Sequence, residues 1–108
     1  MTLTRAIEQE FEDAKKAKAD MVKFGRLKAK ADKEYREAKA KAILKLKLEG
    51  IPSTIVKEVV FDSPDVSRLR YERDAAESLY DASKEEVMLR KLRINYLRDQ
   101  LEAVYRSE

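Results

Sequence analysis

Side chains that commonly perform catalysis are scarce in this chain of 108 residues. It has no His, so the usual general base near neutral pH is missing. It has no Cys, so thiol nucleophiles, disulfides and Cys-bearing metal sites are excluded. Gly25 and Gly50 are its only two glycines, too few for a glycine-rich phosphate loop. The sequence therefore predicts a protein without enzymatic activity and without a cofactor.

Carboxylates are plentiful, but their spacing does not favour a catalytic pair or a metal site. The pairs Glu12–Asp13 and Glu85–Glu86 are adjacent in the sequence. Adjacent residues on a helix point in different directions, so neither pair converges on one site. A site made of acids from facing helices, without any His, would be an uncommon arrangement. We expect no bound metal.

Basic side chains around the middle of the chain could bind the phosphates of nucleic acid. Ile55, Val59, Phe61, Val66 and Leu69 have the apolar spacing of a helix-turn-helix unit, which would extend over about residues 41–73. The basic residues that would contact nucleic acid under this hypothesis are Lys41, Lys45, Lys47, Lys57, Arg68, Arg70 and Arg73.

The same apolar residues also fit a simple structural role, the closure of a helical hairpin. Val56 stands where the helix-turn-helix motif prefers a small residue, and Val60 where it prefers Gly. The lysine-rich stretch 15–47 has the same two interpretations, because it could follow a phosphate backbone or form a solvated face. We favour the structural interpretation for both, and keep DNA binding as the alternative.

Breakers of secondary structure divide the chain into two long segments and a short one. Gly50, Pro52 and Pro64 fall within fifteen residues of one another. Apolar residues step by threes and fours from Ile7 to Leu46, which predicts an amphipathic helix over about 3–49. Gly50 suits the end of this helix because it tolerates a left-handed conformation. The apolar segment that follows predicts a short helix over about 52–60.

A second long helix is predicted over about 64–105. Ser63 can cap it, and Pro64 suits its first position. Its stripe of seam positions, spaced by threes and fours, is Val66, Leu69, Arg73, Ala76, Tyr80, Ser83, Val87, Arg90, Ile94, Leu97, Leu101 and Val104.

Charge favours antiparallel packing of the two long helices. Residues 1–14 carry one base and four acids, and residues 88–106 carry five bases and two acids. Residues 15–47 carry thirteen bases and four acids, and residues 58–86 carry four bases and nine acids. Antiparallel folding places each block beside one of opposite sign. The predicted fold is all-α, a single helical-hairpin domain over residues 1–108.

A second apolar stripe on the last helix predicts self-association. Leu89, Leu92 and Tyr96 lie at helical spacing on a face that the hairpin alone does not cover. Two hairpins that pair into a helical bundle would bury it. No uninterrupted apolar run reaches the roughly 18 residues that span a bilayer, and no signal peptide is visible. We therefore expect a cytoplasmic homo-oligomer with no membrane association.

Three short runs resemble small all-helical accessory proteins of temperate phages of Gram-positive bacteria. The first is Leu44–Pro52, which leads into the short helix; the others are Asp74–Tyr80 and Leu97–Gln100. The likeness extends over the last two thirds of the chain. It implies an accessory protein of the host cytoplasm, from a replication or recombination module, and assigns no residue a role. Together with the composition, it predicts a helical interaction protein that binds itself and another protein.

Overall fold

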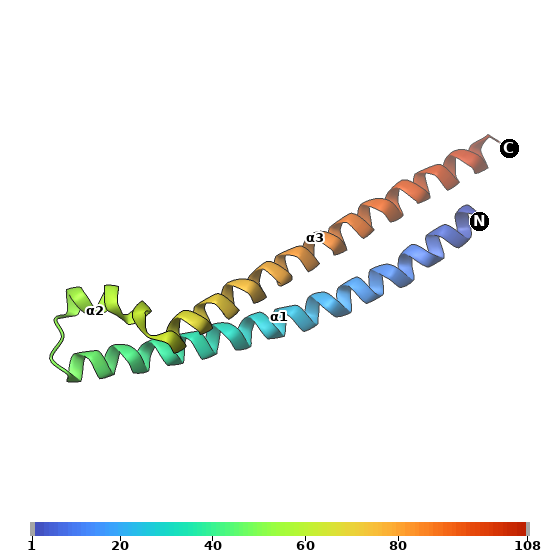
Figure 1. Ribbon diagram of the computed structural model, residues 1–108. Coiled ribbons are helices and arrows are strands. Elements are labelled where there is room, and N and C mark those ends of the chain that lie inside the picture. Colours follow the sequence, from blue (N-terminus) through green and yellow to red (C-terminus); the bar gives the residue numbers. More distant parts are fainter. Residues whose placement is uncertain (1, 108) are drawn as a thin grey trace. The chain divides into compact units, whose positions relative to one another are not determined.

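The all-α fold predicted from the sequence is confirmed by the computed structural model, which describes residues 2–107. Within this range, three α-helices and one 3₁₀ helix follow one another: α1 (Leu3–Leu48), α2 (Ser53–Val59), η1 (Val60–Asp62) and α3 (Pro64–Arg106) (Figure 1). The predicted boundaries of α1 and α3 agree within one residue at each end. None of residues 2–107 belongs to a strand. None of the helices in this range is long and apolar enough to cross a membrane.

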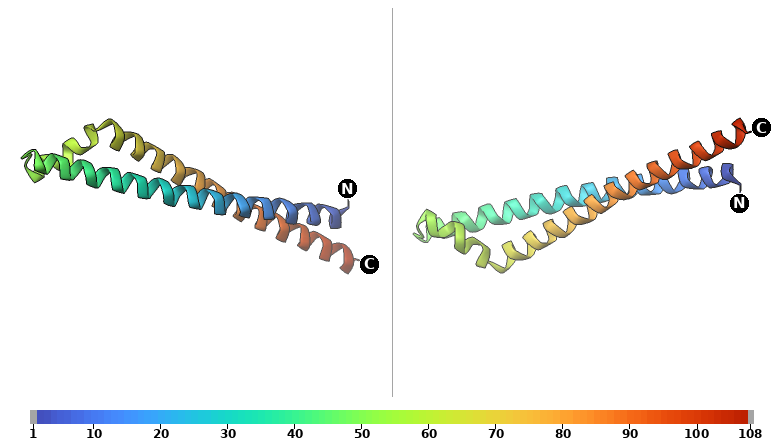
Figure 2. Two further views of the ribbon diagram at one scale, coloured as in Figure 1. Left: turned by 90° about the horizontal axis from the view of Figure 1, so that it is seen from below. Right: turned by 90° about the horizontal axis from the view of Figure 1, so that it is seen from above.

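The chain forms two compact units, and both long helices contribute to each. Unit 1 consists of Met1–Phe24 and Tyr80–Glu108, and unit 2 consists of Gly25–Leu79. Within each unit, the segments of α1 and α3 run antiparallel, as predicted (Figures 1 and 2). The line along which they face each other within a unit is called the seam below. That residues 1–108 behave as one domain stays a prediction.

Both ends of α1 have local stabilisation. The backbone N–H of Arg5 donates to Thr2 Oγ1 at 3.2 Å, so Thr2 caps the N-terminus. At the other end, Gly50 has φ of 85°. Its N–H donates to the carbonyl of Lys47 at 3.0 Å, and the N–H of Ile51 donates to that of Leu46 at 3.1 Å. This pair of bonds is a Schellman motif, which confirms the terminating role predicted for Gly50.

The connection between the long helices and the first turn of α3 contribute the most deeply buried side chains of unit 2. Val56 of α2, Val60 of η1 and Val66 of α3 are 2%, 1% and 1% exposed. The sequence assigned closure to Ile55, but this prediction was wrong, since Ile55 is 46% exposed. Phe61 is half-buried. These three residues, called the valine cluster below, are therefore the best-buried side chains where the two long helices are connected.

The seam stripe predicted for α3 agrees with the observed burial. Each of its positions is buried or half-buried in its own unit, except Val104. The stripe includes Arg73, Ser83 and Arg90, which are not apolar. Their presence means that polar contacts form part of both seams.

Candidate functional site

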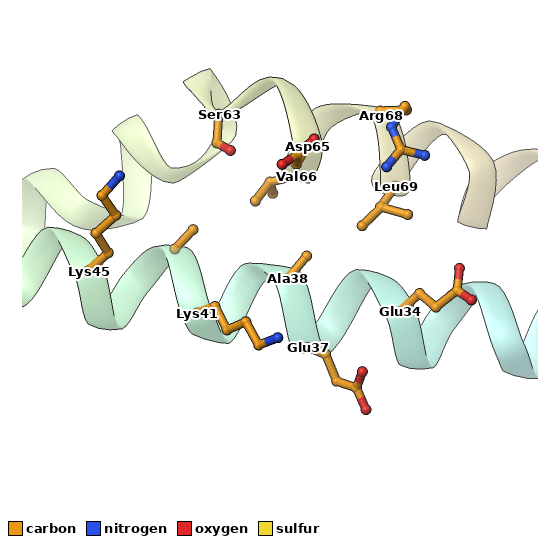
Figure 3. A pocket seen from close by; sticks show the side chains of 11 residues that line it. Glu34, Glu37, Ala38, Lys41, Lys45, Ser63, Asp65, Val66, Arg68 and Leu69 are labelled. Carbon is orange, nitrogen blue, oxygen red and sulfur yellow. The ribbon is translucent and has the colours of Figure 1, made fainter.

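A groove of about 620 Å³ lies in unit 2 between α1 and the first turns of α3 (Figure 3). In Figure 3, Val66 and Leu69 point from α3 towards α1, where Ala38 faces them, whereas Glu37 points away from α3. A second groove of about 390 Å³ adjoins it and shares Ala42, Lys45 and Ser63 with it. The floor of the groove is thus apolar and its rims are charged.

Three of the basic residues predicted for nucleic-acid binding line this groove: Lys41, Lys45 and Arg68. Three acids line it as well: Glu34, Glu37 and Asp65. Arg68 Nη1 also donates to Glu72 Oε1 at 3.0 Å, within α3. The local charge is therefore mixed, and mixed charge gives a weaker attraction for phosphates than a purely basic groove.

The two other predicted arginines lie over aromatic rings of unit 2. The Cζ atom of Arg70 is 4.6 Å from the centroid of the Phe61 ring, and that of Arg73 is 4.4 Å from the centroid of the Tyr35 ring. Tyr35 is 5% exposed, so Arg73 covers a core aromatic residue. These are cation–π contacts, which stabilise the fold locally.

Lys39 and Asp74 complete this cluster. Lys39 Nζ lies 5.2 Å from the Phe61 centroid and 5.8 Å from the Tyr35 centroid. Arg73 Nη2 lies 2.9 Å from Asp74 Oδ1, and this hydrogen bond raises the pKa of Arg73 above its ordinary value. Lys47 and Lys57, the remaining predicted residues, are exposed and do not line the groove. The structure therefore brings together only part of the predicted basic set.

The seam of unit 1 contains an ionic cluster centred on Glu10. This glutamate is 7% exposed and lies 3.2 Å from Arg90 Nη1 through Oε2, and 2.6 Å from Arg93 Nε through Oε1. Asp13 and Glu86 also contact Arg90, at 3.5 Å and 2.8 Å. Hydrogen bonds to Glu10 and Glu86 raise the pKa of Arg90. The contacts of Glu10 and Asp13 join the acidic start of α1 to the basic end of α3, as the charge blocks predicted, whereas that of Glu86 lies within α3.

The residues predicted for self-association form an outward-facing patch in unit 1. Leu89, Leu92 and Tyr96 are 61%, 59% and 61% exposed, and Met88 beside them is 63% exposed. Tyr96 Oη accepts a hydrogen bond from Gln100 at 2.9 Å, which holds the ring along the helix. We call Met88, Leu89, Leu92 and Tyr96 the α3 patch.

Met88 and Glu10 were not predicted from the sequence as candidate residues. Met88 lies four residues before Leu92, so its spacing could have placed it in the patch. Glu10 lies three residues after Ile7 and four before Ala14, which is seam spacing, but a pattern search for apolar residues passes over an acid. Of its partners on α3, Arg90 was among the predicted seam positions, whereas Arg93 was not.

Comparison with known proteins gives no further guide to the site. Among residues 2–107, no group of three or more acids is arranged to hold a metal ion. No protein-family model matches the chain, and neither a curated protein nor a solved structure does. The α3 patch of unit 1 and the groove of unit 2 are therefore the two candidate sites.

Proposed function

We propose that the chain is a non-enzymatic helical interaction protein that associates with a second copy of itself through the α3 patch. The observation that supports this most strongly is the concentration of four large apolar side chains, Met88, Leu89, Leu92 and Tyr96, all about 60% exposed within nine residues. Scattered exposed apolar residues are normal on soluble proteins, but a contiguous patch on a charged helix is typical of an interface.

A second copy is an occupant that the charges of α3 in unit 1 allow. The exposed face of this helix carries both signs, with Lys84 3.4 Å from Asp81 and Arg106 3.4 Å from Glu102. Each base of one copy can therefore meet an acid of the other around the shared apolar contact. In this proposal the assembled protein acts in the cytoplasm as an accessory protein, of the kind that the phage resemblance implies, and presents its remaining helix faces to another protein.

Sedimentation equilibrium at micromolar concentration tests the proposal. We expect wild type to have at least twice the monomer mass, and Leu89→Ser/Leu92→Ser to be monomeric with unchanged helix content. The matched control is Leu44→Ser/Leu48→Ser, which alters two leucines of unit 2 that are also exposed. Its mass should equal that of wild type. A monomeric wild type would refute self-association.

DNA binding is a second candidate function, supported by the convergence of Lys41, Lys45 and Arg68 at the groove of unit 2. An anisotropy titration with duplex DNA at two salt concentrations tests it. Replacement of these three residues by Ala should then weaken binding and reduce the salt slope by about 0.9 for each phosphate that is no longer neutralised. The control is Lys47→Ala/Lys57→Ala, outside the groove. Equal weakening in both variants would indicate only general attraction to phosphate.

A further inference from the structure

Two exposed leucines lie side by side at the end of α1 in unit 2. Leu44 is 59% exposed and Leu48 is 80% exposed. They are four residues apart on α1, so they are neighbours on one face of the helix. Glu37, which points away from α3 in Figure 3, lies two helical turns before Leu44 and therefore on the same face. The two leucines, called the α1 ridge below, thus point away from the seam of unit 2.

Lysines border the α1 ridge on both sides. An α-helix turns by about 100° per residue, which places Lys47 on one side of the ridge and Lys41 and Lys45 on the other. All three lysines are exposed. The last part of α1, residues 38–48, contains four lysines and no acid. This end of the helix is therefore apolar along one line and positively charged on either side of it.

The acids nearest to the α1 ridge along the chain do not cancel this charge. Glu37 Oε1 lies 3.9 Å from Lys33 Nζ, so a lysine farther from the ridge compensates it. Glu49 lines the second groove, between α1 and η1. The surface beside the two leucines is consequently basic.

This combination of charge and exposed leucine restricts what can cover the ridge. The same ridge of a second copy would place lysines against lysines, which opposes association. Duplex DNA would attract the lysines, but its phosphates offer nothing apolar to the leucines. The surface of an anionic bilayer offers phosphates to the lysines and hydrocarbon directly beneath to the leucines. Lysine side chains can extend along such a surface while their charged ends stay in water.

We propose that unit 2 docks on an anionic lipid bilayer through the α1 ridge. Leu44 and Leu48 insert between the lipids, and the flanking lysines contact the headgroups. Contact with a bilayer surface requires only one apolar helix face, not the roughly 18 apolar residues that span a membrane. The sequence-based expectation of no membrane association depended on spanning segments and does not bear on this contact. The site is separate from the α3 patch, which belongs to unit 1.

Sedimentation with vesicles tests the proposal. One set of vesicles contains phosphatidylcholine alone, and the other contains phosphatidylcholine and phosphatidylglycerol. We expect wild type to bind the anionic vesicles and not the zwitterionic ones. Leu44→Ser/Leu48→Ser and Lys41→Gln/Lys47→Gln should each weaken this binding at least about tenfold. All four positions are exposed, so the helix content measured by circular dichroism should not change.

A matched control and a label locate the contact within unit 2. Tyr71→Ser/Leu79→Ser replaces two apolar side chains of α3 that are 74% and 50% exposed, and it should bind as wild type does. The chain has no Cys, so Ala40→Cys or Ala75→Cys provides a single attachment point for a polarity-sensitive fluorophore. Both alanines are exposed, and Ala40 lies one turn before Leu44. Anionic vesicles should shift the emission of the label at position 40 to shorter wavelength and leave that at position 75 unchanged.

Several results would overturn the proposal. Wild type that does not bind anionic vesicles is one, and a control weakened as much as Leu44→Ser/Leu48→Ser is another. Binding that the lysine variant loses and the leucine variant keeps would show attraction to phosphate without insertion, as expected for a DNA-binding surface. An emission shift at position 75 and none at position 40 would place the contact on α3 instead.

Discussion

Unit 2 buries three valines almost completely, whereas the seam of unit 1 contains a glutamate bound to two arginines. In unit 2, the cations near the seam lie over the rings of Tyr35 and Phe61. In unit 1, Arg98 also lies over a ring, that of Phe11, but Arg90 and Arg93 form ion pairs between α1 and α3. The difference indicates two kinds of stabilisation of one helix pair. Apolar burial is insensitive to salt, while partly exposed ion pairs are screened by it.

The largest effect should come from the core aromatic residue of unit 2. Tyr35→Ala removes a ring that is 5% exposed and should lower the free energy of unfolding by about 3–5 kcal/mol. Tyr35→Phe keeps the ring and its contact with Arg73, so it serves as the control. Urea denaturation measures the free energy, and hydrogen exchange locates the change. A decrease in protection greatest in residues 2–24 and 80–107 would contradict the assignment of Tyr35 to unit 2.

The second largest loss of stability should come from a substitution in the valine cluster. Val60→Ala removes two methyl groups from a site that is 1% exposed, at a cost of about 2 kcal/mol. Ile55→Ala, on the preceding helix and 46% exposed, should cost much less. Thermal unfolding of both variants checks this difference. If Ile55→Ala were the more damaging change, Ile55 would after all be the residue that closes the hairpin.

The ionic cluster of unit 1 should respond to salt where the valine cluster does not. Glu10→Gln removes the carboxylate that Arg90 and Arg93 contact, and should lower the midpoint of thermal unfolding by less than Val60→Ala does. Because both arginines are partly exposed, the difference from wild type should shrink at high salt. The destabilisation caused by Val60→Ala should stay the same. A salt-independent effect of Glu10→Gln would show that packing of the side chain matters more than its charge.

The smallest loss of stability should come from a substitution at Gly50, in the turn after α1. Gly50 has a φ of 85°, and no atom lies within 4 Å of a Cβ built there. Gly50→Ala should therefore cost only the conformational penalty of the left-handed region, about 1 kcal/mol. Gly50→Asn should cost less, since Asn adopts this conformation more readily. A cost above that of Val60→Ala would indicate a contact that the structure does not contain.

Much of the fold follows from the sequence because long helices repeat their pattern many times. Twelve positions define the stripe of α3, so a single misleading residue such as Val104 does not change the result. The short helix α2 has only seven residues, too few for its period to be clear. For this reason Ile55 was predicted to be the buried residue of α2, whereas Val56 is the one that is buried.

The candidate sites could be predicted less completely. Leu89, Leu92 and Tyr96 share one helix, so their common face follows from spacing alone. Lys41, Lys45 and Arg68 come from two helices, and the acids Glu34, Glu37 and Asp65 that accompany them depend on the register between these helices. That register also places Arg73 over Tyr35. Which residues of one helix lie beside which residues of another depends on how the helices pack, and a pattern within one helix does not specify this.

The burial of Tyr35 gives unit 2 an intrinsic optical signal. The chain has no Trp, and of its five tyrosines Tyr71, Tyr96 and Tyr105 are well exposed, Tyr80 is half-buried in unit 1, and Tyr35 is buried in unit 2. A tyrosine held rigidly in an asymmetric environment gives near-ultraviolet circular dichroism, whereas a freely rotating ring gives little. The part of the spectrum that Tyr35→Phe removes should therefore come from unit 2, and its disappearance on heating would follow the melting of that unit without any attached label.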